Sequence, residues 1–245
     1  MSEGTYLDEA AGGSLTSRRK FLAGSAAALA GGALMAVPGV AEAQTQPNPP
    51  GDIDILNYAL TLERLEATFY RRVLARFNER EFENANIFDG LGHYVRSHAY
   101  ENFQRISRHE DTHIKTLVSV IKSAGGKPVP QSEYDFGIMS VASAVRTARK
   151  LENTGVKAYD GAIAHIFAAD YVTAGATIAT VEARHASYLN LLNRAVPFPS
   201  AFDDAVAPRT ICEAVQAFIT SSPKPYGPYR SLEALCRRLP TSPTP

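Results

Sequence analysis

Apolar side chains recur at intervals of three and four residues along four long stretches of this chain. This spacing places them on one face of an α-helix, because a helix turns once every 3.6 residues. Asp52 or Asp54 is expected to cap the start of the first helix, and Gly125 and Pro197 follow the ends of the second and the fourth. The pattern predicts an all-α protein with helices over residues 53–77, 94–124, 138–168 and 171–196.

The segments between and after these helices have other patterns. Residues 78–92 are rich in glutamate and predict a solvated loop. Residues 125–137 have no helical period, so we expect a long crossover that returns the chain before the second helix pair. Residues 197–245 predict an extension with two short helices, at 211–220 and 232–239.

One carboxylate interrupts the apolar face of the first helix. Glu63 lies in the middle of that face, where a buried charge needs a partner. Glu66 lies on nearly the same face and is the alternative. We favour Glu63 because Tyr70 follows it by seven residues, and Glu152 and Tyr159 repeat this offset in the third helix. Both tyrosines are candidates for a catalytic or hydrogen-bonding role, or they fill the core.

The second and fourth helices each carry a Glu-x-x-His tetrad within the apolar face. Residues three apart share one face of a helix, so each tetrad presents a carboxylate and an imidazole to the same point. His109 and Asp111 point elsewhere, and we expect them at the surface or behind the ligands. The candidate metal ligands, in chain order, are Glu63, Glu110, His113, Glu152, Glu182 and His185.

This order of Glu, Glu-x-x-His, Glu and Glu-x-x-His resembles the ferritin-like superfamily. The resemblance implies a four-helix bundle over residues 53–196, in which these six residues hold two transition-metal ions. Carboxylates and imidazoles, with no nearby cysteine, favour iron or manganese. By the same resemblance, Glu110 and Glu152 are expected to bridge the two ions.

The segment from Leu62 to Tyr70, together with the N-terminal leader, looks most like exported ferritin-like proteins related to plant desiccation-related proteins. The resemblance implies oxygen or peroxide chemistry in stress protection, as in an oxidase, peroxidase or catalase-like oxidoreductase. The alternative is a structural or desiccation-protective protein in which the metal only stabilises the bundle. A homo-oligomer is compatible with both.

The N-terminal residues have the features of a targeting segment. Residues 17–22, Ser-Arg-Arg-Lys-Phe-Leu, resemble a twin-arginine export signal and precede an Ala/Gly-rich run. Ala41 and Ala43 supply the small residues that a signal peptidase reads. We therefore expect a signal over residues 1–43, a flexible leader over 44–52, and a periplasmic or secreted protein. An uncleaved membrane anchor is the alternative, which the Gly and Pro residues of the run disfavour.

Cysteine content and net charge bear on disulfide formation and on the partners of the protein. The chain has two cysteines, Cys212 and Cys236, and in an exported protein such a pair predicts a disulfide; two separate buried thiols are the alternative. Lys and Arg number 25, and Asp and Glu also number 25. This balance favours neither a nucleic-acid partner nor, after signal cleavage, a membrane partner.

Overall fold

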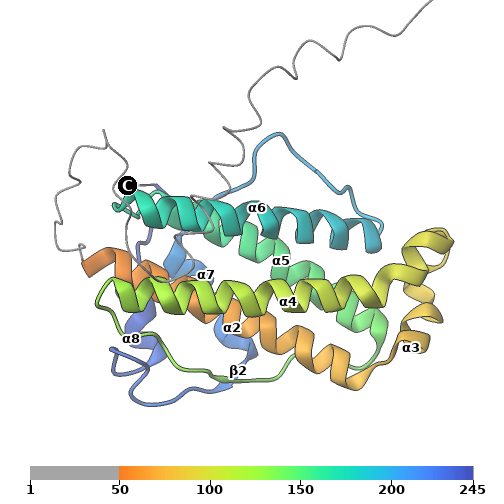
Figure 1. Ribbon diagram of the computed structural model, residues 1–245, viewed down its shortest axis with the longest axis horizontal. Coiled ribbons are helices and arrows are strands. Elements are labelled where there is room, and N and C mark those ends of the chain that lie inside the picture. Colours follow the sequence, from red (N-terminus) through yellow and green to blue (C-terminus); the bar gives the residue numbers. More distant parts are fainter. Residues whose placement is uncertain (1–49, 245) are drawn as a thin grey trace, which may run out of the picture. The chain divides into compact units, whose positions relative to one another are not determined.

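Four long helices form a bundle in the computed structural model, which describes residues 50–244 (Figure 1). The four are α2 (Pro50–Arg76), α4 (His93–Ser123), α5 (Val141–Ile163) and α6 (Ala169–Leu192). Helix α2 packs mainly against α4, and α5 packs mainly against α6, while α2 and α5 also contact each other. The all-α bundle predicted from the apolar spacing is confirmed.

The buried face of each helix is the face that the apolar spacing predicts. In α4, Phe103, Ile106, Leu117 and Ile121 are buried at intervals that keep them on one side. The ring of Phe103 packs edge-on against Tyr70 of α2, with 5.5 Å between ring centroids. Because this interior excludes water, any polar group inside it must find its partners within the bundle.

The connection between α4 and α5 runs along the bundle before α5 begins, as Figure 1 shows. Its strand β1 (Glu133–Tyr134) pairs antiparallel with β2 (Ile219–Ser221) of the C-terminal extension. The predicted crossover is confirmed. The strand pairing was not predicted, because strands of two and three residues are too short to show an alternating pattern.

The stretch between α2 and α4 is more ordered than the solvated loop that its charges suggested. The side chain of Asn78 accepts the backbone N–H of Glu81, and the Glu81 carboxylate accepts the N–H of Asn78. This capping box fixes one turn of helix, and Phe82 and Phe88 are buried beside it. The two short helices here are α3 (Glu79–Glu83) and η1 (Asn86–Phe88).

Two of the long helices end several residues earlier than predicted. Helix α6 stops at Leu192 because Arg194 adopts a left-handed conformation, with φ of 57°, and the N–H of Ala195 bonds to the carbonyl of Asn190. This is the Schellman arrangement, which usually has glycine at the position that Arg194 occupies. The sequence therefore carried no stop signal before Pro197. Helix α5 ends at Ile163 rather than at residue 168.

Asp52 does not cap the helix on which it lies. Helix α2 already begins at Pro50, so residues 50–52 are helical and do not belong to the predicted flexible leader (44–52). The buried Asp52 carboxylate instead accepts the backbone N–H groups of Phe167 and Ala168, each at 3.0 Å. It thus holds the turn between α5 and α6 against the start of α2 and shortens the third predicted helix.

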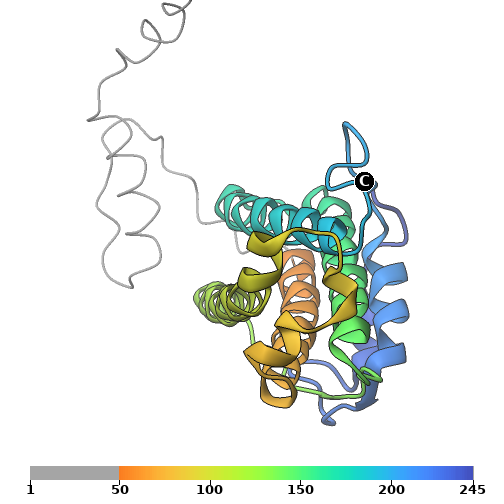
Figure 2. The ribbon, with the colours of Figure 1, turned by 90° about the vertical axis from the view of Figure 1, so that its right-hand side faces the viewer.

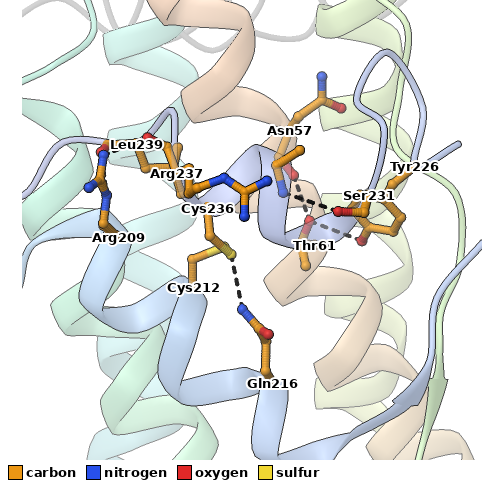
Figure 3. The surroundings of a disulfide bond; sticks show 11 residues. Asn57, Thr61, Arg209, Cys212, Gln216, Tyr226, Ser231, Cys236, Arg237 and Leu239 are labelled. Atoms are coloured by element: carbon orange, nitrogen blue, oxygen red, sulfur yellow. Dashed lines mark hydrogen bonds between the residues drawn. A yellow bond between two sulfur atoms is a disulfide. The ribbon is translucent and has the colours of Figure 1, made fainter. Parts of the chain in front are cut away.

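The C-terminal extension packs against α2 and α5 on the side away from α4 (Figure 2). Its helices are α7 (Pro208–Ala214), the 3-10 helix η2 (Val215–Phe218) and α8 (Leu232–Cys236). The two predicted short helices are present, the first as α7 and η2 in succession. A disulfide joins Cys212 of α7 to Cys236 of α8, with 5.6 Å between the Cα atoms (Figure 3). The predicted pairing is confirmed, and the alternative of two separate thiols is wrong.

Buried polar contacts tie this extension to the first half of α2. The hydroxyl of Tyr229 donates to Asp54 at 2.7 Å, and the guanidinium of Arg238 donates to the same carboxylate at 2.9 Å. The hydroxyls of Tyr226 and Thr61 lie 3.2 Å apart (Figure 3). The Asp54 carboxylate therefore binds side chains of the extension and does not cap α2.

None of the described helices is long and apolar enough to cross a lipid bilayer. The predicted export signal, its cleavage after Ala43 and the leader up to residue 49 lie outside the described residues.

Candidate metal centre

All six predicted ligands point into one cluster in the interior of the bundle. Each of the four long helices contributes, and every one of the six side chains is buried. The i, i+3 spacing brings the Glu and His of each tetrad to the same face, as the sequence predicted. The contributors are Glu63 from α2, Glu110 and His113 from α4, Glu152 from α5, and Glu182 and His185 from α6.

The cluster consists of two overlapping groups of potential ligands. Within each group, one oxygen or nitrogen from every residue lies within 4.8 Å of the others. Glu110 and Glu182 belong to both groups. The geometry therefore makes these two carboxylates the shared pair, whereas we had expected Glu110 and Glu152. The groups are Glu63, Glu110, His113 and Glu182, and Glu110, Glu152, Glu182 and His185.

The Nδ1 atom of each ligand imidazole faces carboxylates. His113 Nδ1 lies 3.1 Å from Glu63 Oε2 and 3.3 Å from Glu110 Oε2. His185 Nδ1 lies 3.2 Å from Glu110 Oε1 and 3.2 Å from Glu152 Oε2. Each imidazole thus meets Glu110 and one glutamate that is not shared, which gives the cluster an approximate twofold arrangement.

Each of the two predicted tyrosines donates a hydrogen bond to a glutamate on the other helix. Tyr70 lies on α2 but donates its hydroxyl hydrogen to Glu152 Oε1 of α5 at 2.5 Å. Tyr159 lies on α5 and donates to Glu63 Oε1 of α2 at 2.5 Å. The repeated seven-residue offset therefore reflects an exchange between two helices, because each tyrosine orients the glutamate of the other helix.

Close packing of these groups changes their proton affinities. Burial and then the charge of Glu182 raise the pKa of Glu110 well above the usual value for a glutamate, and the same causes raise the pKa of Glu152 to about 8. Burial alone would lower the pKa of His113, but its carboxylate neighbours raise it to about 12. Without a cation the cluster therefore retains protons, which a bound metal ion would displace.

Three buried carboxylate oxygens support the fit of a cation. Glu110 Oε1 and both oxygens of Glu182 have no hydrogen-bond partner among the described residues. Their contacts are ion pairs without hydrogen-bond geometry: His185 Nδ1 lies 3.2 Å from Glu110 Oε1 and 3.8 Å from Glu182 Oε2, and His113 Nδ1 lies 3.1 Å from Glu182 Oε1. A buried carboxylate oxygen that accepts no hydrogen bond is costly, and coordination to a metal ion would reduce that cost. These three oxygens belong to the two shared residues, where two ions would need ligands.

Glu66, the alternative ligand on α2, is a fifth buried carboxyl group, beside the four glutamates of the cluster. Burial and then the charges of Glu182 and Glu152 raise its pKa well above the usual value. It belongs to neither group of potential ligands. A Cβ at Gly155 would lie 3.2 Å from Glu66 Oε1 and 3.4 Å from Glu182 Oε2, so this glycine leaves room for both carboxylates. The sequence identified Glu66 only as an alternative and did not indicate that both α2 glutamates are buried.

The two polar residues that flank Glu110 in the chain make different contacts near the surface. His109 is exposed, yet its Nδ1 lies 2.9 Å from Nε2 of His185, on the side away from the carboxylates. Asp111 forms an ion pair with Arg71 at 2.7 Å on the surface. Both positions agree with the expectation of surface or supporting residues. The contact between His109 and His185 joins α4 to α6. The sequence around His109 could not predict it, because it depends on how the two helices pack.

The sequence was compared with family models, solved structures and curated proteins. A family model described as a ferritin-like domain matches residues 51–194, which include all six clustered residues. Among solved structures, a conserved hypothetical protein from Mycobacterium tuberculosis is 20% identical, with a TM-score of 0.43; the match covers 62% of this chain and 98% of that one. No curated protein matches the sequence.

Proposed function

Because this chain belongs to the ferritin-like domain family, we propose that it is an exported dimetal carboxylate protein with oxygen or peroxide chemistry in stress protection. The proposed cofactor is a pair of iron or manganese ions. The proposed ligands are the six residues Glu63, Glu110, His113, Glu152, Glu182 and His185.

The observation that carries this proposal is the sharing of Glu110 and Glu182 between the two groups. A carboxylate has two oxygens, so a shared carboxylate can bind two neighbouring ions at once. Each group also offers one imidazole and one glutamate of its own. This set of hard oxygen and imidazole ligands suits iron or manganese better than metals that prefer thiolate.

Each part of the cluster has a role in this proposal. Glu63 and Glu152 would each bind one ion, while the hydroxyls of Tyr159 and Tyr70 fix their other oxygens. The buried surroundings keep bulk water away from the centre. A pair of iron or manganese ions would supply two electrons for the reduction of an O–O bond.

Export is supported by the sequence of the leader and by the disulfide. The bond between Cys212 and Cys236 is of the kind that persists in oxidising compartments. Replacing Arg18 and Arg19 by lysine should leave the protein in the cytoplasm if the leader is a twin-arginine signal. Unchanged export of this variant would contradict the proposed route.

Metal analysis followed by a turnover assay tests the proposed centre. The purified protein, reconstituted with iron or manganese, should hold about two ions per chain. Glu182→Gln should lose most of this metal, because one residue serves both ions. Glu213→Gln, at an exposed position of α7, is the matched control and should keep it. Glu110→Ala and His185→Ala should lower metal content and melting temperature together.

The outcomes separate the proposal from its alternative. Consumption of oxygen or peroxide by the loaded protein, lost in Glu182→Gln, supports the proposed chemistry. Bound metal without any turnover would favour a purely stabilising metal. No bound metal after reconstitution with either ion would overturn the proposed centre itself.

A further inference from the structure

One exposed side chain contacts the cluster from outside the bundle. His109 of α4 is exposed, and its Nδ1 atom lies 2.9 Å from Nε2 of His185. The two rings are nearly parallel, with 11° between their planes and 5.2 Å between their centroids. The other hydrogen bonds that described residues make to the cluster from outside it come from Tyr70 and Tyr159, which are buried. His109 therefore links the surface to the cluster through a single hydrogen bond.

The outer face of α4 beside His109 carries a line of positive charge. Arg108, Lys115 and Lys122 are exposed and follow one another at intervals of seven residues. Seven residues make about two helical turns, so the three side chains lie in one line along the helix. None of them forms an ion pair with a described residue. We call these three residues the α4 stripe.

No free carboxylate of α4 offsets the charge of the stripe. Within residues 105–127 the two acidic residues are Glu110, which is buried in the cluster, and Asp111, which pairs with Arg71 at 2.7 Å. The stripe runs from residue 108 to residue 122, a length of about 21 Å at 1.5 Å per residue. This length matches the contact surface of a protein and exceeds the size of a small molecule. The unpaired cations fit a partner with a negative surface.

The proposed chemistry needs a source of electrons. A two-electron reduction of an O–O bond takes one electron from each of the two ions, and a donor must return both electrons before the next turnover. All six clustered residues are buried, so a donor of protein size has to act from the surface. The hydrogen bond between His109 and His185 provides a connection that an electron can cross while the donor stays outside.

We propose that the α4 stripe is the docking surface for an acidic one-electron carrier protein, and that electrons pass from this partner through His109 and His185 to the metal centre. Complementary charge speeds the encounter and orients the partner, and complexes for electron transfer are typically small and weak. This inference rests on the proposed function. It selects chemistry that draws electrons from a partner protein over a catalase-like reaction, which needs no electron donor.

Binding of an acidic carrier by the metal-free protein tests the docking surface without turnover. The probe is oxidised plant-type ferredoxin, and calorimetry at low ionic strength should show binding that high salt abolishes. Lys115→Glu combined with Lys122→Glu should weaken this binding about tenfold or more. Arg146→Glu combined with Lys150→Glu, at exposed positions of α5, is the matched control and should bind as the unaltered protein does. Equal affinity of the two double variants would overturn the docking surface, as would tighter binding to anionic lipid vesicles or to DNA than to ferredoxin.

Reduction kinetics then test the delivery of electrons. In the loaded, oxidised protein, the Lys115→Glu and Lys122→Glu double variant should slow reduction by ferredoxin about tenfold and leave reduction by hydroxylamine, a small uncharged reductant, and the metal content unchanged. His109→Phe, compared at equal metal content, should keep its affinity for ferredoxin but be reduced by it more slowly, relative to hydroxylamine. An unchanged ratio in this variant would overturn the route through His109. A protein that binds ferredoxin on the α4 stripe but no metal would refute the proposed function while the docking surface stands.

Discussion

The two buried glutamates of α2 show how the surroundings of a residue decide its role. Glu63 faces the imidazole of His113 and accepts the hydroxyl of Tyr159. Glu66, three residues on, lies beside Gly155 and outside both groups of potential ligands. Both carboxylates are equally acceptable as metal ligands in chemical terms, so their positions relative to the other helices distinguish them.

Replacing each glutamate in turn should give different results. Glu63→Ala removes a proposed ligand and leaves the buried hydroxyl of Tyr159 without its hydrogen-bond acceptor, so metal content should fall and stability should drop by about 1–3 kcal/mol. Glu66→Ala should retain more metal. Elemental analysis and thermal unfolding of both variants provide the measurement, and the opposite ranking would make Glu66 the ligand from α2.

His109 offers a test at a residue outside the proposed ligand set. A partner on the outer nitrogen of a ligand histidine fixes the orientation of its ring, and losing such a partner typically lowers metal affinity by about 10–100-fold. His109→Ala should weaken binding at the group that contains His185, while the ion beside His113 stays. Chelator competition measures the two affinities. His98→Ala, near the start of the same helix, is the control, and equal weakening of both ions would contradict this role.

At the scale of elements, glycines on α5 and α6 differ in what their backbones approach. A Cβ at Gly161 of α5 would overlap the carbonyl oxygen of Val206, in the connection that follows α6. The N–H of Val206 also bonds to the carbonyl of Lys157 at 3.2 Å. This connection therefore lies directly on the backbone of α5, and Gly161 allows the close approach.

Alanine at the two helical glycines should consequently change stability in opposite directions. Gly161→Ala should destabilise the protein by about 1–3 kcal/mol, because the connection must move away. Gly175→Ala meets no atom and should stabilise α6 by about 0.5–1 kcal/mol through the higher helix propensity of alanine. Thermal unfolding measures both, and equal stability of the two variants would show that the connection does not rest on α5.

At the scale of the whole molecule, the C-terminal extension and the metal centre depend on different residues. The disulfide closes a segment with a sequence separation of 24, and all proposed ligands lie before it in the chain. Such a cross-link stabilises a fold by roughly 3 kcal/mol, mainly by restricting the unfolded chain. The extension contacts the outer side of α2 and α5, whereas the cluster lies in the interior.

Reduction of the disulfide should therefore lower the melting temperature and leave the bound metal in place. A variant with serine at Cys212 and Cys236 should lose a similar amount of stability, roughly 3 kcal/mol. Calorimetry and elemental analysis before and after reduction check this prediction. Parallel loss of metal would show that the extension supports the centre, and two free thiols in the denatured native protein would contradict the disulfide.

The sequence by itself determined the four helices and the six clustered residues, because both depend on short-range spacing. A helix repeats every 3.6 residues, so apolar intervals and the two Glu-x-x-His tetrads could be recognised within single segments. The early end of α6 could not, because it depends on Arg194 adopting a conformation that usually requires glycine.

Only the tertiary structure decided how these segments work together. The pairing of Glu110 with Glu182 as shared residues and the exchange of Tyr70 and Tyr159 between helices both involve atoms from different helices. Their relative positions depend on the rotation and depth at which whole helices pack. No local pattern of residues records those quantities, since they result from the close packing of the complete core.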